Sequence, residues 1–232
     1  MSLLAHYIFD NNINSETGSY NGSTAYQITY QPIPAGFNLP GKMAVFTGSS
    51  QSRIDLPNIA AFAGAGAKSV SFWAKTTSVG VWQTAFSAGN RTATGNHFVI
   101  ILEDTVGAGV VVQGHGNDAY AQGLVVNDGV LRHFAVIYPG SGGSNAVQLY
   151  MDNVARPMVG NSSANLNTYN GNFGLGRRRE ANDMFFTGSL ANVKIFSHAL
   201  SQAEVADLYH EGVPPPPPET DGTALLAMMV GT

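Results

Sequence analysis

The residues in this chain that could do chemistry are carboxylates, histidines and loop aromatics, and they form none of the common catalytic motifs. Glycoside cleavage needs two carboxylates that face one site. Glu103 and Asp104 are adjacent, so on a strand they would point to opposite sides. The chain has no Gly-x-Ser-x-Gly or His-Glu-x-x-His motif, and its histidines show no metal-ligand spacing. The sequence therefore predicts a protein that is not an enzyme, and glycoside hydrolase or lyase activity is the last of the alternatives.

Aromatic, amide and charged side chains gather in the predicted loops, and this combination suits sugars. A pyranose stacks its C–H face on an aromatic ring, while its hydroxyls take hydrogen bonds from polar side chains. We expect the glycan-binding candidates to be Trp82, Arg91, His115, Asn117, Asp118, Tyr120, Arg177 and Arg178. For the arginines, the alternative is a solvated loop, or one arginine paired with Glu180 or Asp183.

The composition excludes several classes of protein. Only 11% of the residues are charged, against about 25% in a typical soluble domain. A net charge of −4 with scattered lysines and arginines argues against nucleic-acid binding. The absence of cysteine excludes disulfides, a cysteine metal site and a cysteine nucleophile. The N-terminus lacks the pattern of a signal peptide, and no run reaches the roughly 18 apolar residues of a membrane span.

The elements that must position these side chains are strands. Lys68–Lys75 places Val70, Phe72 and Ala74 on one face, with Trp73 on the other and buried beneath a loop. Leu190–Phe196 alternates in the same way, with Ala191, Val193 and Ile195 expected to face together. Further strands are expected at Tyr26–Tyr30 and Gly123–Val126, and a hairpin is expected from Met43–Phe46 and Arg53–Leu56. Many short strands separated by turn signals predict an all-β sandwich.

One short helix is expected near the C-terminus. Ser201 and Glu204 have the spacing of a capping box, in which each side chain bonds the backbone amide of the other residue. Leu200 and Val205 have the spacing of a hydrophobic staple. Gly212 is expected to end the helix.

Five blocks in order resemble the laminin-G-like, concanavalin-A-like jelly-roll family. They are Leu3–Asn12, Val70–Lys75, Leu131–Tyr138, Gln148–Asn153 and Phe186–Tyr209, the last with the sequence FTGSLANVKIFSHALSQAEVADLY. The resemblance implies a concanavalin-A-like jelly-roll β-sandwich of two antiparallel sheets with one short C-terminal helix, over residues 1–212. The family is functionally broad, so the resemblance implies the fold and not the activity.

The same resemblance implies a calcium site. Relatives often hold calcium between the opening Phe-Asp and acidic residues of the closing strand. Asp10 matches the first part, whereas Ala191 and Asn192 stand where relatives often have two aspartates. Calcium at Asp10 and Asn192 is therefore the only cofactor expected. The alternative is that Asp10 caps a turn.

The end of the chain differs in composition from the rest. Residues 213–219 contain a run of five prolines and are expected to form a stiff polyproline spacer. Residues 220–232 form an apolar docking tail that would be an aggregation liability if it were free. The residues expected to dock on a partner are Pro214, Pro215, Pro216, Leu225, Leu226, Met228, Met229 and Val230. The alternative is that the tail folds back on its own sandwich.

These features favour a non-catalytic binding or structural module on a larger assembly. We expect a bacteriophage virion surface protein, either a capsid decoration or a tail-associated protein, which also binds a cell-surface glycan. Its partners would be protein subunits. It would be made in the cytoplasm without a signal peptide and then displayed on a virion or another extracellular particle. The alternative is a free carbohydrate-binding, lectin-like module.

Overall fold

A computed structural model of the chain describes residues 2–103 and 108–213 and shows two eight-stranded sheets in which every pair of strands is antiparallel. Sheet A runs in the order β13 (Val154–Arg156), β12 (Gln148–Met151), β11 (Arg132–Tyr138), β6 (Lys68–Lys75), β16 (Thr187–Phe196), β4 (Lys42–Thr47) and β3 (Thr29–Pro32), and β1 (Leu3–Tyr7) also pairs with β16. Sheet B runs in the order β14 (Val159–Gly160), β10 (Ala119–Gln122), β9 (Ala108–Gln113), β8 (His97–Glu103), β7 (Trp82–Gly89), β15 (Gly174–Leu175), β5 (Arg53–Asp55) and β2 (Thr24–Tyr26).

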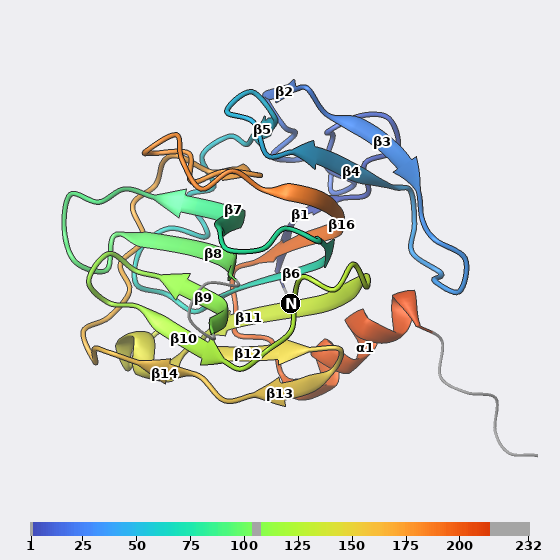
Figure 1. Cartoon of the computed structure of the whole chain (residues 1–232). Coiled ribbons are helices and arrows are strands. Elements are labelled where there is room, and N and C mark those ends of the chain that lie inside the picture. The colour runs from blue at the N-terminus through green and yellow to red at the C-terminus, as the bar shows by residue number, and fades with distance from the viewer. Residues whose placement is uncertain (1, 104–107, 214–232) are drawn as a thin grey trace, which may run out of the picture.

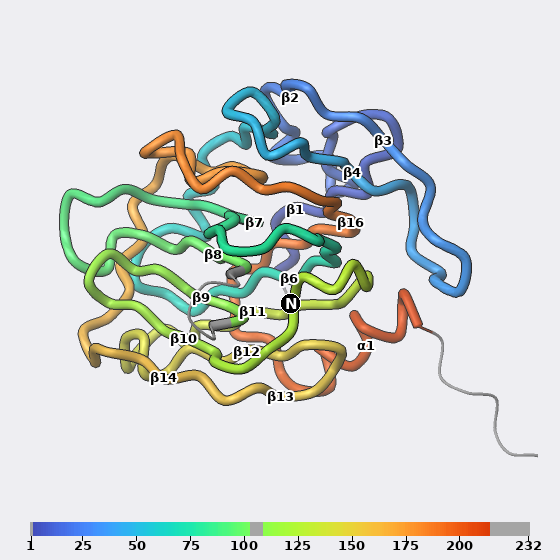
Figure 2. The backbone as a smooth tube through the Cα atoms, viewed as in Figure 1, coloured from blue at the N-terminus to red at the C-terminus, as the bar shows by residue number. Residues whose placement is uncertain are grey.

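The corresponding edges of the two sheets lie at the same ends of the molecule. Figure 1 shows β2, β3, β4 and β5 (blue) together at one end of the molecule and β12, β13 and β14 (yellow) at the other. The first and last strands, β1 and β16, lie side by side although they are far apart in the sequence, as the tube in Figure 2 shows. Two helical elements complete the described chain, the 3-10 turn Gly143–Ala146 and the helix α1 (Gln202–Gly212).

The hydrophobic core lies between the two sheets, because strand alternation points one apolar face of each sheet inward. Phe72 of β6 stacks on Phe134 of β11, with ring centroids 5.3 Å apart. Phe62 extends from a loop into the core, where it packs on sheet B and contacts Phe86 and Phe98 edge to face. This packing confirms the predicted jelly-roll sandwich of two antiparallel sheets.

Strand β16 departs from the strict alternation that the sequence predicted. Its pairing with β6 shifts register between Ala191 and Lys194, and Asn192 has the left-handed φ of 47°. Asparagine is one of the residues that tolerates such a φ, which is typical of a bulge. As a result Val193 and Ile195 enter the core with Leu190, whereas Ala191 faces outward.

Helix α1 covers the outer face of sheet A, and its start is as predicted. Ser201 Oγ accepts from the Glu204 amide, while the Ser201 amide donates to Glu204 Oε2 over 2.7 Å. Leu200 and Val205 join one apolar cluster on sheet A. Trp73 is buried on the outer face of β6 as predicted, but helix α1 covers its ring through the stacked Tyr209 in addition to the loop residue Phe37.

Three local predictions were wrong. The segment Tyr26–Tyr30 belongs to two strands, β2 in sheet B and β3 in sheet A. Strands β4 and β5 do not form a hairpin, because they too belong to different sheets. The strand expected at Gly123–Val126 is a loop, and the neighbouring residues of β10 form the strand instead. Local pattern cannot show which sheet a strand joins, because pairing partners are distant in sequence.

The predicted spacer and docking tail lie outside the described residues, from Pro214 onward. The longest helix within residues 2–103 and 108–213 has 11 residues, so none of the described helices could cross a membrane.

Candidate functional site

The outer face of sheet B carries the two aromatic candidates. Trp82 begins β7 and Tyr120 lies in β10, and both pack with other side chains on an apolar floor. That floor consists of Val99, Ile101 and Val111, which alternate with core residues along β8 and β9. Trp82 and Tyr120 are half-buried, so each ring lies at the surface of this face. We call the outer face of sheet B formed by Trp82, Tyr120 and their floor the aromatic face.

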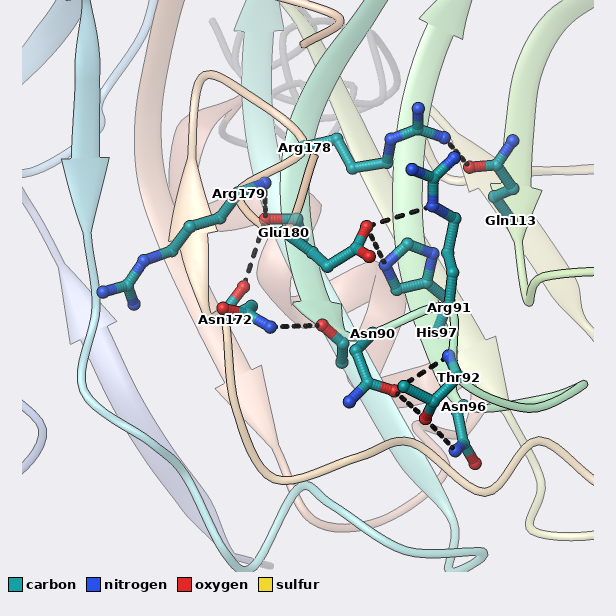
Figure 3. Close-up of polar contacts among 12 residues, drawn as sticks. Asn90, Arg91, Thr92, Asn96, His97, Gln113, Asn172, Arg178, Arg179 and Glu180 are labelled. Atoms are coloured by element: carbon teal, nitrogen blue, oxygen red, sulfur yellow. Dashed lines mark hydrogen bonds and ion pairs between the residues drawn. The ribbon is translucent and has the colours of Figure 1, made fainter. Parts of the chain in front are cut away.

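A charged group lies at the other end of the same strands. Figure 3 shows Arg91 from the β7–β8 loop reaching Glu180, with Nε 3.0 Å from Oε2. His97, the first residue of β8, lies behind this pair with its Nε2 4.0 Å from the same oxygen. The pair is half in solvent, since the side chains of Arg91 and Glu180 are 41% and 24% exposed. A ligand on this face would therefore meet a cation and a carboxylate together.

The His97 ring is uncharged near neutral pH. Burial, together with the charges of Arg178 and Arg91, lowers the pKa of His97 to about 3. A neutral imidazole has one donor and one acceptor nitrogen. Its Nδ1 is buried with no hydrogen-bond partner among the described atoms. His97 therefore contributes shape and one donor or acceptor, but no charge.

The three consecutive arginines fasten the segment before β16 to sheet B. Arg178 is buried, and its guanidinium forms an ion pair with Asp183 and donates to Gln113 Oε1 over 2.9 Å. Arg177 Nη2 donates over 2.9 Å to Asp55, which lies on β5. The Arg178–Asp183 pair confirms the alternative in which one of these arginines pairs with Glu180 or Asp183. Whether Arg177 and Arg178 also contact a sugar stays a prediction.

Arg179 completes this attachment. Its Nη1 donates to the backbone oxygens of Leu56 and Phe173, each over 2.8 Å. Its Nε lies 3.4 Å from Asp55 Oδ1. The three residues directly before Glu180 are thus bound to sheet B and its neighbouring loops, and Glu180 itself pairs with Arg91.

The candidates of the β9–β10 turn have mostly structural contacts. Asn117 is fully buried, and it accepts from the Ser144 amide over 2.8 Å and donates to the backbone oxygen of Ala164. Asp118 Oδ1 accepts from the Gly114 amide over 2.8 Å, which closes the turn. His115 is half-buried in that turn with a φ of 56°, and it lies close enough to His97 to help lower its pKa.

The structure thus places Trp82 and Tyr120 on one face of sheet B and Arg91 at the far end of the same strands, with His115 near His97. Sequence reasoning missed His97, and it grouped Glu180 with the neighbouring arginines and not with Arg91. The alternation of HFVIILE could have found His97, because Phe98, Ile100 and Leu102 point into the core and His97 must point out. No local signal pairs Arg91 with Glu180, since they are 89 residues apart.

The two residues of the predicted calcium site have different surroundings. Asn192 is buried, where it accepts from His6 Nε2 over 2.5 Å and donates to Glu211 Oε2 over 3.3 Å. Asp10 is exposed, and its backbone oxygen accepts from Asn12 over 3.0 Å in a turn. Within residues 2–103 and 108–213, no three His, Asp or Glu side chains gather as metal ligands would. Calcium binding stays a prediction.

Two sheets closed into a jelly roll, with polar and aromatic side chains on an outer sheet face, define a lectin-type β-sandwich. The family model of the concanavalin A-like lectin/glucanases superfamily matches residues 47–206. The chain belongs to this superfamily, as its five sequence blocks predicted. A search of curated protein sequences found no significant match.

Solved structures show the same fold. One is domain 4 of AbnA, a GH43 extracellular arabinanase from Geobacillus stearothermophilus, in complex with arabinotriose. It is 24% identical to this chain, with a TM-score of 0.70, and the match covers 90% of this chain and 98% of that domain. The binding domain of Paraclostridial Mosquitocidal Protein 1 is 13% identical with a TM-score of 0.61, and the receptor-binding domain of botulinum neurotoxin type G is 10% identical with a TM-score of 0.58. Each match covers 90% of this chain but only 51% of the toxin domain, so the chain spans about half the length of each.

Proposed function

We propose that this chain is a non-catalytic carbohydrate-binding module whose binding surface is the aromatic face of sheet B together with the Arg91–Glu180 pair. The observation that carries the proposal is that Trp82 and Tyr120 share one sheet face and that this exposed ion pair lies at the far end of the same strands. Aromatic rings accept the C–H face of a sugar, and a guanidinium beside a carboxylate offers donors and acceptors to neighbouring hydroxyls.

The carboxylates of this face suit binding better than glycoside cleavage. Glycoside cleavage needs two carboxyl groups that face one site and are available to the substrate. Glu180 is paired with Arg91, and Asp183 is paired with Arg178. Both carboxylates therefore accept hydrogen bonds from protein groups. The arabinotriose in the complex of the similar AbnA domain suggests a probe for this chain.

The test has two parts. The full chain is titrated with arabinotriose, and its binding to other sugars is screened on a glycan array. We expect Trp82→Ala and Tyr120→Ala each to weaken glycan binding about tenfold, because a stacked ring contributes roughly 1 kcal/mol beyond its buried area. Tyr150→Ala is the matched control, since Tyr150 is also half-buried but packs on the outer face of sheet A. A wild-type chain that binds no glycan, or binding that survives both aromatic substitutions, would contradict the proposal.

The bacteriophage virion surface remains a prediction about where such a module works. It rests on the low charge, on the lack of cysteine and on a tail whose residues lie outside the described ranges. It is compatible with glycan binding, because a displayed module can capture a cell-surface sugar. Mass measurement of the protein in solution tests it, and a monodisperse monomer that stays monomeric when Pro214–Thr232 is deleted speaks against the assembly.

A further inference from the structure

A small pocket lies between the end of β16 and α1, on the outer face of sheet A. Its volume is about 170 Å³. Three of its lining residues are apolar and three are acidic, and they are Phe196, Leu200, Leu208, Glu204, Asp207 and Glu211. We call it the acidic pocket. It lies on the side of the sandwich opposite the aromatic face, because α1 covers sheet A and the aromatic face belongs to sheet B.

The three carboxylates share one side of α1, because positions i, i+3 and i+7 lie along one helix face. Glu204 is held by the capping box and by His198 Nε2, 2.9 Å from Oε1. Glu211 Oε1 accepts from Lys194 Nζ over 2.7 Å. Asp207 is exposed and has no hydrogen bond or ion pair with any described residue. One of the three acids is therefore uncommitted.

The pocket carries net negative charge. Its three carboxylates face two basic side chains, Lys194 and His198. Even with His198 protonated, three negative charges exceed two positive ones. The Ser201 amide and His198 hold the pKa of Glu204 at about 2, so this carboxylate stays ionised near neutral pH. A cation with an apolar stem matches both halves of the lining.

We propose that the acidic pocket docks a lysine side chain of a partner protein. The four-carbon stem would lie on Phe196, Leu200 and Leu208, and the ammonium would reach Asp207. Lysine suits this arrangement because it buries its methylene stem along apolar surface while its compact ammonium stays near the water. The pocket and a lysine side chain are complementary, since the pocket offers the unpaired carboxylate of Asp207 beside apolar side chains.

The chain itself does not supply this lysine from its own tail. Residues 214–232 contain no lysine or arginine, and they carry Glu219 and Asp221. A second copy would have to present one of four lysines, of which Lys68 and Lys194 are buried and Lys42 and Lys75 are only partly exposed. A different protein is therefore the fitting partner. It could bind while the aromatic face holds a glycan, because the two surfaces lie on opposite sheets.

The probe is Nα-acetyl-lysine N-methylamide, added to the full-length chain and followed by amide NMR shifts. We expect saturable shifts at Phe196, Leu200 and Leu208, and no such shifts with the norleucine analogue, which lacks the ammonium. Asp207→Asn should weaken the interaction about threefold, the size of one exposed ion pair. Glu16→Gln is the matched control, since Glu16 is exposed and lies outside the pocket lining; it should change nothing.

Four outcomes would overturn the proposal. Equal shifts from lysine and norleucine would mean that the pocket takes apolar groups without selecting charge. Shifts that spread away from α1 would mean non-specific attraction. Shifts of the pocket residues on dilution would assign the pocket to a second copy of this chain. Shifts of the pocket residues caused by Leu226→Asp in the full-length chain would assign it to the tail.

Discussion

Lys68 Nζ donates a hydrogen bond to Thr168 Oγ1 over 3.0 Å, although the two residues are 100 positions apart in the sequence. The same ammonium donates to the backbone oxygen of Gly64 over 2.5 Å. Lys68 is fully buried at the start of β6, near the rings of Phe62 and Tyr138. A single lysine thus ties two loops to the end of sheet A, and no carboxylate is among its hydrogen-bond partners.

This burial predicts a pH dependence of stability. It lowers the pKa of Lys68 from 10.5 to about 7. Between these values the unfolded chain holds the proton and the folded chain does not, so the free energy of unfolding rises with pH. The slope from this group is at most about 1.4 kcal/mol per pH unit. Chemical denaturation at pH values from about 7 to 9 measures it.

Lys68→Met should remove that slope, because methionine does not titrate. Lys42→Met is the matched control, since Lys42 is partly exposed and should leave the slope unchanged. If wild type and Lys68→Met have parallel stability profiles over this range, the buried ammonium does not govern the pH response.

Ser201→Ala should destabilise the protein by about 1 kcal/mol. The substitution removes the hydroxyl that accepts from the Glu204 amide at the start of α1. Urea unfolding measures the loss as a lower midpoint with an unchanged m-value. Ser163→Ala is the control, because Ser163 is exposed in a loop and its change should lie within about 0.5 kcal/mol of zero. An equal effect of the two substitutions would show that the cap contributes nothing.

Gly212→Ala should destabilise the contact between α1 and sheet A. A Cβ at this position would lie 2.5 Å from Trp73 Cζ2 and 2.8 Å from Leu39 Cδ2. Overpacking of this kind costs about 1–3 kcal/mol, which exceeds the helix-propensity gain of alanine. Thermal unfolding and tryptophan fluorescence measure the effect. Gly66→Ala is the matched control, because its Cβ would meet open space. A Gly212→Ala chain as stable as wild type would contradict the close approach.

Asn192→Asp should also lower stability. The amide of Asn192 donates to Glu211, and an aspartate would replace this donor with a second carboxylate. Loss of a buried hydrogen bond and like-charge repulsion together cost roughly 1–3 kcal/mol. The measurement is the denaturation midpoint at neutral pH. Recovery at acidic pH, where the new carboxyl is protonated, would support repulsion as the cause, whereas an unchanged midpoint at neutral pH would refute it.

The predicted calcium site has a separate test. Calcium bound at Asp10 and Asn192 would stabilise only the folded chain, so excess calcium should raise the Tm relative to a chelator. Asp10→Asn should abolish that rise. Asp128→Asn is the control, since Asp128 pairs with Arg132 elsewhere in the fold. A wild-type Tm that is the same in calcium and chelator would end the prediction.

Part of the candidate site could be predicted from the sequence. Trp82, Tyr120 and Arg91 were expected to bind a glycan because of their residue types. The two aromatic residues lie on one face of sheet B, and Arg91 lies at the far end of the same strands. Asn117 and Arg178 were expected there too, but both are buried and hold protein groups. A polar residue in a predicted loop can face the ligand or brace the loop, and only its distant partners show which.

The sequence alone determined the class of fold and some of the local elements. The alternation in β6 and the capping box of α1 depend on residues within one turn or one strand, so their pattern can be read without the rest of the chain. The tertiary structure decided which sheet β4 and β5 join, how Arg91 meets Glu180 and which acid of α1 stays uncommitted. Each of these depends on contacts between segments far apart in sequence, which packing of the two sheets brings together.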